Sequence, residues 1–306
     1  MVRPAAEIYG DYAEPAEYET RWRDLVSRLG GREQVAGTSV EGRPLWRFDL
    51  GNQSASAPVV LLTALMHGVE LIGSVALFDI VKRLGESPDG IGERARMVVM
   101  PVLNPDALAA NMARLQRRRL AFQRKNAAGV DLNRNFDVAF GMGAPLGGCD
   151  AENYPGAGAF SEPETQALRR VVNEAPPALS LGFHSFGNSL LWPFAHSRMP
   201  SPRDGWYRRL ADVFAHGLPI TPYRCRQSFE LYPTVGDLDD WLDTTYGTAA
   251  LTVEASALDD RLFDPRRLFN PFCWMNPTRI AETVANLSPA VIGLMAAAIT
   301  APALIS

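Results

Sequence analysis

Two of the four histidines in this 306-residue chain follow apolar stretches typical of buried strands. His67 ends the run PVVLLTALMH, with Glu70 three residues later, and His184 ends ALSLGFH. An imidazole buried there needs a polar partner, because an unpaired buried polar group costs free energy. Two imidazoles and a carboxylate suit zinc and leave a fourth position open, as in catalytic zinc sites. The spacing His67-x-x-Glu70 is by itself weak evidence for a metal site, because such a pair also occurs by chance at a helix start.

The other two histidines have plainer explanations. His216 stands before Gly217 at the end of a helical stretch, where a histidine stabilises the helix C-terminus. His196 follows LLWPFA, and we expect it in a loop near the surface. Neither is a candidate ligand.

Two further stretches contain polar groups that could surround a metal. The segment RKNAAGVDLNRNFD (124–137) carries arginines and asparagines around one short apolar step. Guanidinium groups bind carboxylates, so this segment could bind a substrate that carries one. The alternative interpretation of the segment is a polar loop with a helix cap. Glu254 lies in LTVEAS (251–256), where a carboxylate among apolar residues is costly unless a partner or a function holds it.

Strand and helix patterns alternate along the chain, which predicts an α/β fold with a largely parallel sheet covered on both faces. In such sheets ligands bind at the carboxyl ends of strands. His67, Asn104, His184 and Glu254 all stand at or just past such ends. The expected strands are 33–40, 44–51, 57–66, 95–104, 178–184, 188–194 and 247–255, and the expected helices are 15–29, 70–84, 104–116, 161–175, 203–217 and 277–300. Ser161 and Glu164 predict a capping box for the helix at 161–175.

Composition limits the class of protein. The formal net charge of −4 argues against nucleic acid or an anionic membrane as the main partner. Three widely spaced cysteines argue against a disulfide scaffold. The N-terminus lacks a basic start followed by an apolar core, so we expect a cytoplasmic protein. The uncharged stretch 289–305 is short for a membrane span and predicts a buried terminal helix. We expect residues 1–306 to form one domain without a pro-domain.

The motifs follow one another in the order HGVE, NPDA, RKN with GVDLNRNFD, SEPET, GFHS with LLWPF, LYPTVGDLDDW and LTVE. In this order and approximate spacing the chain resembles the A/B-type zinc metallocarboxypeptidases, from residue 40 to about residue 257. The resemblance implies a zinc carboxypeptidase-like fold and one Zn²⁺ per chain. It assigns the metal to His67, Glu70 and His184, and it makes Asp131 the carboxylate that orients a ligand imidazole.

The resemblance also implies roles in catalysis and substrate binding. Asn133 and Arg134 would clamp the terminal carboxylate of a peptide, which makes the enzyme an exopeptidase. Arg124 would stabilise the oxyanion that develops on the scissile carbonyl. Tyr232 would close over the substrate, and Glu254 would act as the catalytic base towards a water activated by zinc.

Departures from the family pattern concern the substrate. Val69 stands where the family often has an arginine between the first two ligands, and Phe186 replaces a tyrosine. Asp239 occupies the position that forms the floor of the pocket for the C-terminal side chain, which favours a basic or amine-bearing residue. However, four aspartates crowd DLDDWLD (237–243), and a solvated acidic helix start is the alternative.

Two other functions remain open at this point. A zinc amide deacylase would use the same metal triad on N-acyl amino acids, small amides with a free carboxylate. An inactive binding module would retain the fold without turnover, although the presence of Arg124 and Glu254 beside all three ligands argues against it.

Overall fold

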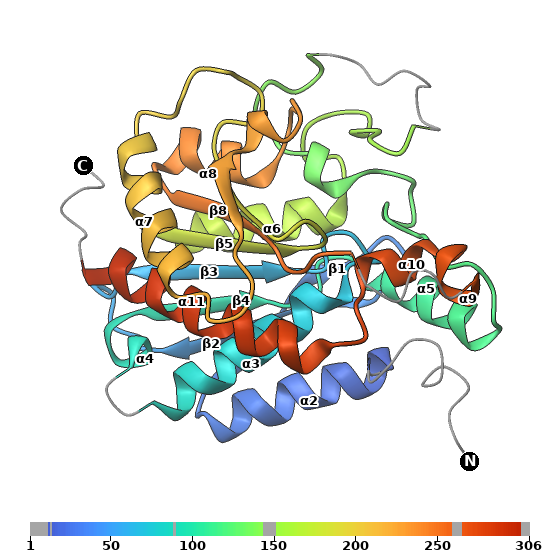
Figure 1. The fold of residues 1–306 in the computed structure, drawn as a ribbon, viewed down its shortest axis with the longest axis horizontal. Coiled ribbons are helices and arrows are strands. Elements are labelled where there is room, and N and C mark those ends of the chain that lie inside the picture. Colours follow the sequence, from blue (N-terminus) through green and yellow to red (C-terminus); the bar gives the residue numbers. More distant parts are fainter. Residues whose placement is uncertain (1–11, 13, 88–89, 143–150, 259–264, 301–306) are drawn as a thin grey trace.

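An eight-stranded mixed sheet forms the centre of the computed structural model, which describes residues 12, 14–87, 90–142, 151–258 and 265–300 (Figure 1). The strand order is β1-β2-β4-β3-β5-β8-β6-β7. The central strands β4, β3, β5 and β8 are parallel, whereas β1, β2 and β6 join through antiparallel pairs. The strands are β1 (Arg32–Thr38), β2 (Pro44–Gly51), β3 (Val59–Ala64), β4 (Arg96–Met100), β5 (Leu179–His184), β6 (Ser189–Trp192), β7 (Arg224–Gln227) and β8 (Ala249–Glu254).

Helices cover both faces of this sheet, so the predicted α/β fold is confirmed. Helices α2, α3, α7 and α11 pack on one face, and α6 and α8 pack on the other. Figure 1 shows α3 and α11 crossing in front of the strands. The helices are α2 (Pro15–Arg28), α3 (Leu71–Glu86), α4 (Ile91–Arg94), α5 (Pro105–Gln116), α6 (Pro163–Glu174), α7 (Asp204–His216), α8 (Leu238–Tyr246), α9 (Pro265–Leu268), α10 (Pro271–Met275) and α11 (Ile280–Thr300), with 3-10 turns η1 (Leu132–Arg134) and η3 (Ser228–Glu230).

The central strands are buried on both sides, which explains their nearly continuous apolar sequences. Alternate residues of β3 illustrate this: Leu62 faces the core formed with α3 and α11, and Leu61 faces the core formed with α6 and α8. A polar residue inside these strands would be buried on either face. Polar chemistry is therefore placed at the strand ends.

The predicted C-terminal helix corresponds to α11. By length and composition alone α11 could cross a membrane. In this fold, however, it packs against α3 and α7, and Leu287, Val291 and Leu294 are completely buried in the core.

One local prediction, the capping box, is wrong, and the alternative of a solvated acidic start for α8 is ruled out. Helix α6 begins at Pro163 with Glu162 as its N-cap and no side-chain cap, because Ser161 donates to Glu162 and Glu164 accepts the backbone N–H of Val40. The acidic start of α8 is also not solvated, because Asp237, Asp239, Asp240 and Asp243 are all buried.

Candidate metal centre and substrate cavity

The first two predicted ligands lie on the turn that connects β3 to α3. The chain leaves β3 at Ala64, and Leu65 adopts a left-handed conformation with a φ of 51°. Gly68 then packs closely against α5, since a Cβ at this position would lie 2.3 Å from the Cβ of Ala107. Glu70 is the N-cap residue of α3. The turn thus needs a glycine between the two ligands, and it directs both His67 and Glu70 to one side.

The three predicted ligands converge. His184 is the last residue of β5, and its Nδ1 lies 3.2 Å from His67 Nδ1 and 3.0 Å from Glu70 Oε2. His67 Nδ1 lies 2.9 Å from Glu70 Oε1. Donor atoms about 2.0–2.1 Å from one tetrahedral zinc ion lie about 3.4 Å apart. The donor set and its buried position therefore fit one zinc ion.

Asp131 contacts the first ligand from behind. Its Oδ1 lies 3.1 Å from His67 Nε2, and its Oδ2 accepts a hydrogen bond of 3.0 Å from Arg124 Nη2. Burial alone would raise the pKa of Asp131, but Arg124, Arg134 and His67 together hold it well below its usual range. An ionised carboxylate at this place fixes the ring orientation and tautomer of a metal-binding imidazole.

Glu254 lies beside the metal ligands through the pairing of two strands. It ends β8 and is the register partner of His184 on β5. Burial raises the pKa of Glu254 to about 7, with Glu70 acting in the same direction while His184 and Arg124 oppose it. A carboxylate that titrates near neutrality can both accept and return a proton, as a general base must.

These groups border one cavity of ≈ 330 Å³. The predicted carboxylate clamp lies in its wall, where Arg134 Nη1 donates to the backbone oxygen of Asn133 and Asn133 Oδ1 accepts from the N–H of Leu238 at 3.0 Å. Tyr232 is 50% exposed at the mouth, with its ring 6.0 Å from the guanidinium of Arg134. The structure thus brings the predicted ligands, catalytic groups and substrate-binding residues into the cavity wall, and Asp131 contacts that wall from behind. Asn104, the other polar residue predicted at a strand end, does not line the cavity, because its side chain caps α5 and donates to the backbone oxygen of Met66.

The aspartates of α8 separate into two groups. Asp240 accepts hydrogen bonds from the N–H groups of Ala195 and His196 and pairs with the His196 imidazole. Asp243 binds Arg203 and the Tyr207 hydroxyl. These carboxylates face away from the cavity and stabilise the surrounding loops.

Asp239 and Asp237 line the cavity instead. Asp239 Oδ2 accepts a hydrogen bond of 2.7 Å from Thr252 Oγ1, and burial raises the pKa of Asp239 to about 7. Asp237 caps α8 through the N–H of Asp240, and burial together with Asp240 and Asp239 raises its pKa well above the usual range. Neither Asp237 nor Thr252 was a predicted site residue. The N-cap position of Asp237 before an apolar helix was the available signal.

The two departures from the family pattern have different consequences. Val69 is completely buried, and its backbone oxygen accepts a hydrogen bond from Asn276 Nδ2. It cannot touch a substrate. Phe186 does line the cavity and brings an aromatic ring without a hydroxyl to its wall.

Residues 30–274 match the family model described as zinc carboxypeptidase, which covers most of the chain. The chain belongs to the zinc carboxypeptidase family. Among curated relatives, it is 29% identical over 175 residues to carboxypeptidase B from Helicoverpa zea, covering 53% of this chain and 41% of that protein. It is 25% identical over 254 residues to carboxypeptidase O from Bos taurus, covering 78% of this chain and 66% of that protein. The chain thus spans between about two fifths and two thirds of these relatives' lengths.

Solved structures of zinc carboxypeptidases share the fold. Carboxypeptidase A from Helicoverpa armigera superposes with a TM-score of 0.77 at 23% identity, covering 94% of this chain and 73% of that one. A metallo-carboxypeptidase from Burkholderia cenocepacia gives a TM-score of 0.64 at 19% identity, covering 96% and 70%. The buried His67–Glu70–His184 group meets the metal requirement of this zinc carboxypeptidase family.

Proposed function

We propose that this protein is a zinc-dependent metallocarboxypeptidase that releases the C-terminal residue of peptides, with a preference for a basic residue there. The observation that carries the proposal is the composition of one cavity. It contains the metal donor set, the Glu254 carboxylate, and the Arg134–Asn133 pair. A hydrolytic centre and a carboxylate clamp in the same cavity define an exopeptidase, because an internal peptide bond has no carboxylate to offer Arg134.

Each side chain has a defined task in this proposal. When bound, zinc lowers the pKa of water and polarises a carbonyl. Glu254 takes a proton from the attacking water and returns it to the leaving amine. Arg124, which lies 3.4 Å from Glu70 and 3.0 Å from Asp131, donates to the oxyanion as its charge develops. Tyr232 covers the bound residue and excludes solvent.

The proposed specificity rests on Asp239 and Asp237. Both line the cavity on the side of α8, where the charge of Arg134 offsets only part of the rise in the pKa of Asp237. Two buried carboxylates disfavour their own ionisation unless a cation lies between them. A lysine or arginine side chain supplies that cation. The amine of a residue such as diaminopimelate would supply a cation in the same pocket.

An amide deacylase that cleaves N-acyl amino acids is the second candidate. The burial of Val69 favours the deacylase. The family often has an arginine at this position that contacts upstream peptide residues, whereas Val69 is withdrawn from the cavity. The α8 aspartates favour the peptidase.

The deciding experiment is a scan of the C-terminal residue. Matched tripeptides ending in Lys, Arg, Leu or Phe, each as free acid and as amide, would be compared with N-acetyl-lysine. Much faster cleavage of the free acids than of the amides, with Lys and Arg fastest, is the expected result. Equal cleavage of the amides would contradict exopeptidase action, and turnover of N-acetyl-lysine alone would favour the deacylase.

A further inference from the structure

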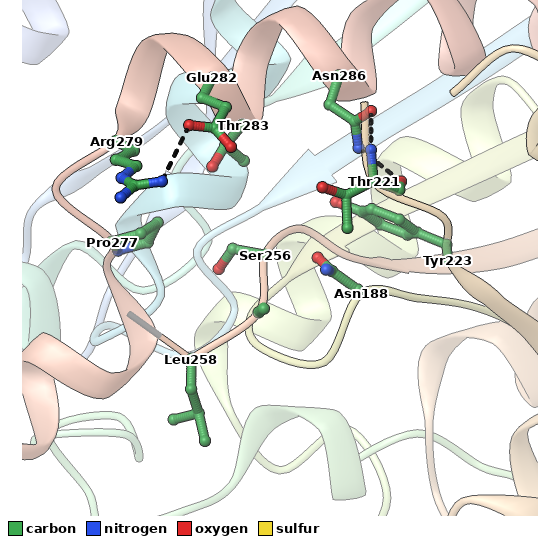
Figure 2. A pocket seen from close by; sticks show the side chains of 11 residues that line it. Asn188, Thr221, Tyr223, Ser256, Leu258, Pro277, Arg279, Glu282, Thr283 and Asn286 are labelled. Atoms are coloured by element: carbon green, nitrogen blue, oxygen red, sulfur yellow. Dashed lines mark hydrogen bonds and ion pairs between the residues drawn. The ribbon is translucent and has the colours of Figure 1, made fainter. Parts of the chain in front are cut away.

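A second cavity of ≈ 200 Å³ lies between the carboxyl end of β8 and the N-terminal half of α11 (Figure 2). One water molecule occupies about 30 Å³ of liquid volume, so this space can hold a small organic ligand. Figure 2 shows Asn188 and Tyr223 extending into it from one side, while Glu282 and Thr283 reach towards it from α11.

The cavity that contains the His67–Glu70–His184 group is called the metal cavity below. The second cavity is separated from it by segments that contribute to both. Ser185 and Phe186 line the metal cavity, and Asn188 lines the second one. Likewise Glu254 lines the metal cavity, and Ser256 lies in the second cavity's wall. The backbone oxygen of Ser256 accepts the N–H of Asn188 at 3.1 Å, which ties the two segments together. An occupant of the second cavity would therefore lie beside the proposed base.

Two hydroxyls in this wall lack a hydrogen-bond partner among the described residues. Ser256 is 4% exposed, and its Oγ is buried without a partner. Tyr223 is 9% exposed; its ring packs against Phe214, and its hydroxyl, which unlike Ser256 Oγ is not fully buried, makes no hydrogen bond within the described part of the chain. Buried hydroxyls in folded proteins nearly always have a partner. An occupant of the cavity would supply it.

The other lining groups define the chemistry of that occupant. The side chains of Asn188 and Thr283 form no hydrogen bond within the described residues, so they too are available. Hydroxyls and amides both donate and accept. At the rim Arg279 and Glu282 form an ion pair of 3.5 Å, which balances the local charge. A complementary ligand is thus neutral and carries several groups that also donate and accept, which describes a polyol or a sugar.

We propose that this cavity is a second ligand site, which binds a neutral polyhydroxylated molecule of monosaccharide size. Ser256, Tyr223, Asn188 and Thr283 hydrogen-bond its hydroxyls. The site is separate from the metal cavity, and the proposal does not rest on the proposed peptidase function.

Saturation-transfer NMR on the zinc-loaded full chain tests this, with glucose, N-acetylglucosamine and myo-inositol as probes. At least one probe should bind. Ser256→Ala and Tyr223→Phe should each weaken that binding by about three- to tenfold, as expected for one hydrogen bond. Thr283→Trp should abolish it by filling the space.

Two control variants locate the binding. Ser180→Ala removes another buried hydroxyl that lacks a partner and does not line the cavity, and it should leave binding unchanged. Arg134→Gln alters the metal cavity and should also leave it unchanged. The proposal is overturned if no probe binds, if binding survives all three cavity variants, or if Arg134→Gln removes it. Circular dichroism of each variant separates lost binding from lost folding.

Discussion

Replacing Asp239 by asparagine should remove the preference for lysine while leaving the cavity intact. Asparagine has nearly the same size, and its side-chain oxygen can still accept the hydrogen bond from Thr252 Oγ1. The N-cap of α8 is unaffected, because Asp237 supplies it. The change therefore removes charge rather than shape.

The size of the effect follows from Coulomb's law. An ammonium about 4 Å from a carboxylate gains about 4 kcal/mol at an effective dielectric constant of about 20. Two effects make the difference between the parent and Asp239→Asn smaller than this. The ammonium loses its hydration in the pocket, and the Asp237 carboxylate that remains in the variant still attracts it. We expect a loss of about 2–3 kcal/mol for lysine substrates, which is roughly 30- to 150-fold in kcat/KM.

The assay compares tripeptides that end in lysine with those that end in norleucine, a neutral residue of similar shape. The lysine-to-norleucine ratio of kcat/KM isolates the charge term, because any general loss of activity cancels. Asp243→Asn is the control: its carboxylate lies on the same helix but binds Arg203 and Tyr207, so stability should fall without a change in the ratio.

A lysine-to-norleucine ratio in Asp239→Asn within twofold of the parent value would refute the assignment of Asp239. If Asp237→Asn lowers the ratio instead, Asp237 is the main partner of the ammonium. Asparagine is as good an N-cap as aspartate, so this second variant should keep α8 intact.

Three further outcomes are expected. Glu254→Gln should lower kcat by at least about 10²-fold while metal analysis still finds one zinc per chain, so loss of zinc or retained turnover would contradict its role as base. Arg134→Gln should raise KM for free-acid peptides and leave the slow cleavage of their amides unchanged; equal losses for both would place Arg134 outside the carboxylate clamp. Because the pKa of Asp239 is raised to about 7 in the folded chain, its neutral form is favoured by folding, and the free energy of unfolding should fall as pH rises from about 4 to 7. Asp239→Asn should flatten this slope in denaturant titrations of the ligand-free protein, and an unchanged slope would show that Asp239 is not responsible.

The sequence predicted the centre of the fold because burial on both faces leaves a clear pattern. Leu61 and Leu62 belong to a nearly continuous apolar run, and such a run in a parallel sheet must end where polar groups begin. His67, His184 and Glu254 stand at those ends, so their positions follow from the same pattern. Their convergence on one point required the strand order β3-β5-β8, for which the resemblance to a family was needed.

Other features depend on contacts that no local pattern reveals. The aspartates of α8 look solvated in sequence, but the helix packs against β8 and β5, which buries them. Strand β7 (RCRQ) carries two arginines at the sheet edge and has no apolar alternation. The capping box failed because Ser161 and Glu164 both have tertiary partners elsewhere, which compete with the local bond.

The pairing of His184 with Glu254 has a consequence for how this site can change over time. Neighbouring strands lie about 4.8 Å apart, so the spacing between metal ligand and base is set by backbone hydrogen bonds rather than by side-chain reach. One residue inserted into or deleted from β5 or β8 would turn one of the two groups to the opposite face of the sheet. Insertions in the loops around the cavity carry no such penalty. Substrate preference can therefore diverge through loop length, while the lengths of these two strands are held constant.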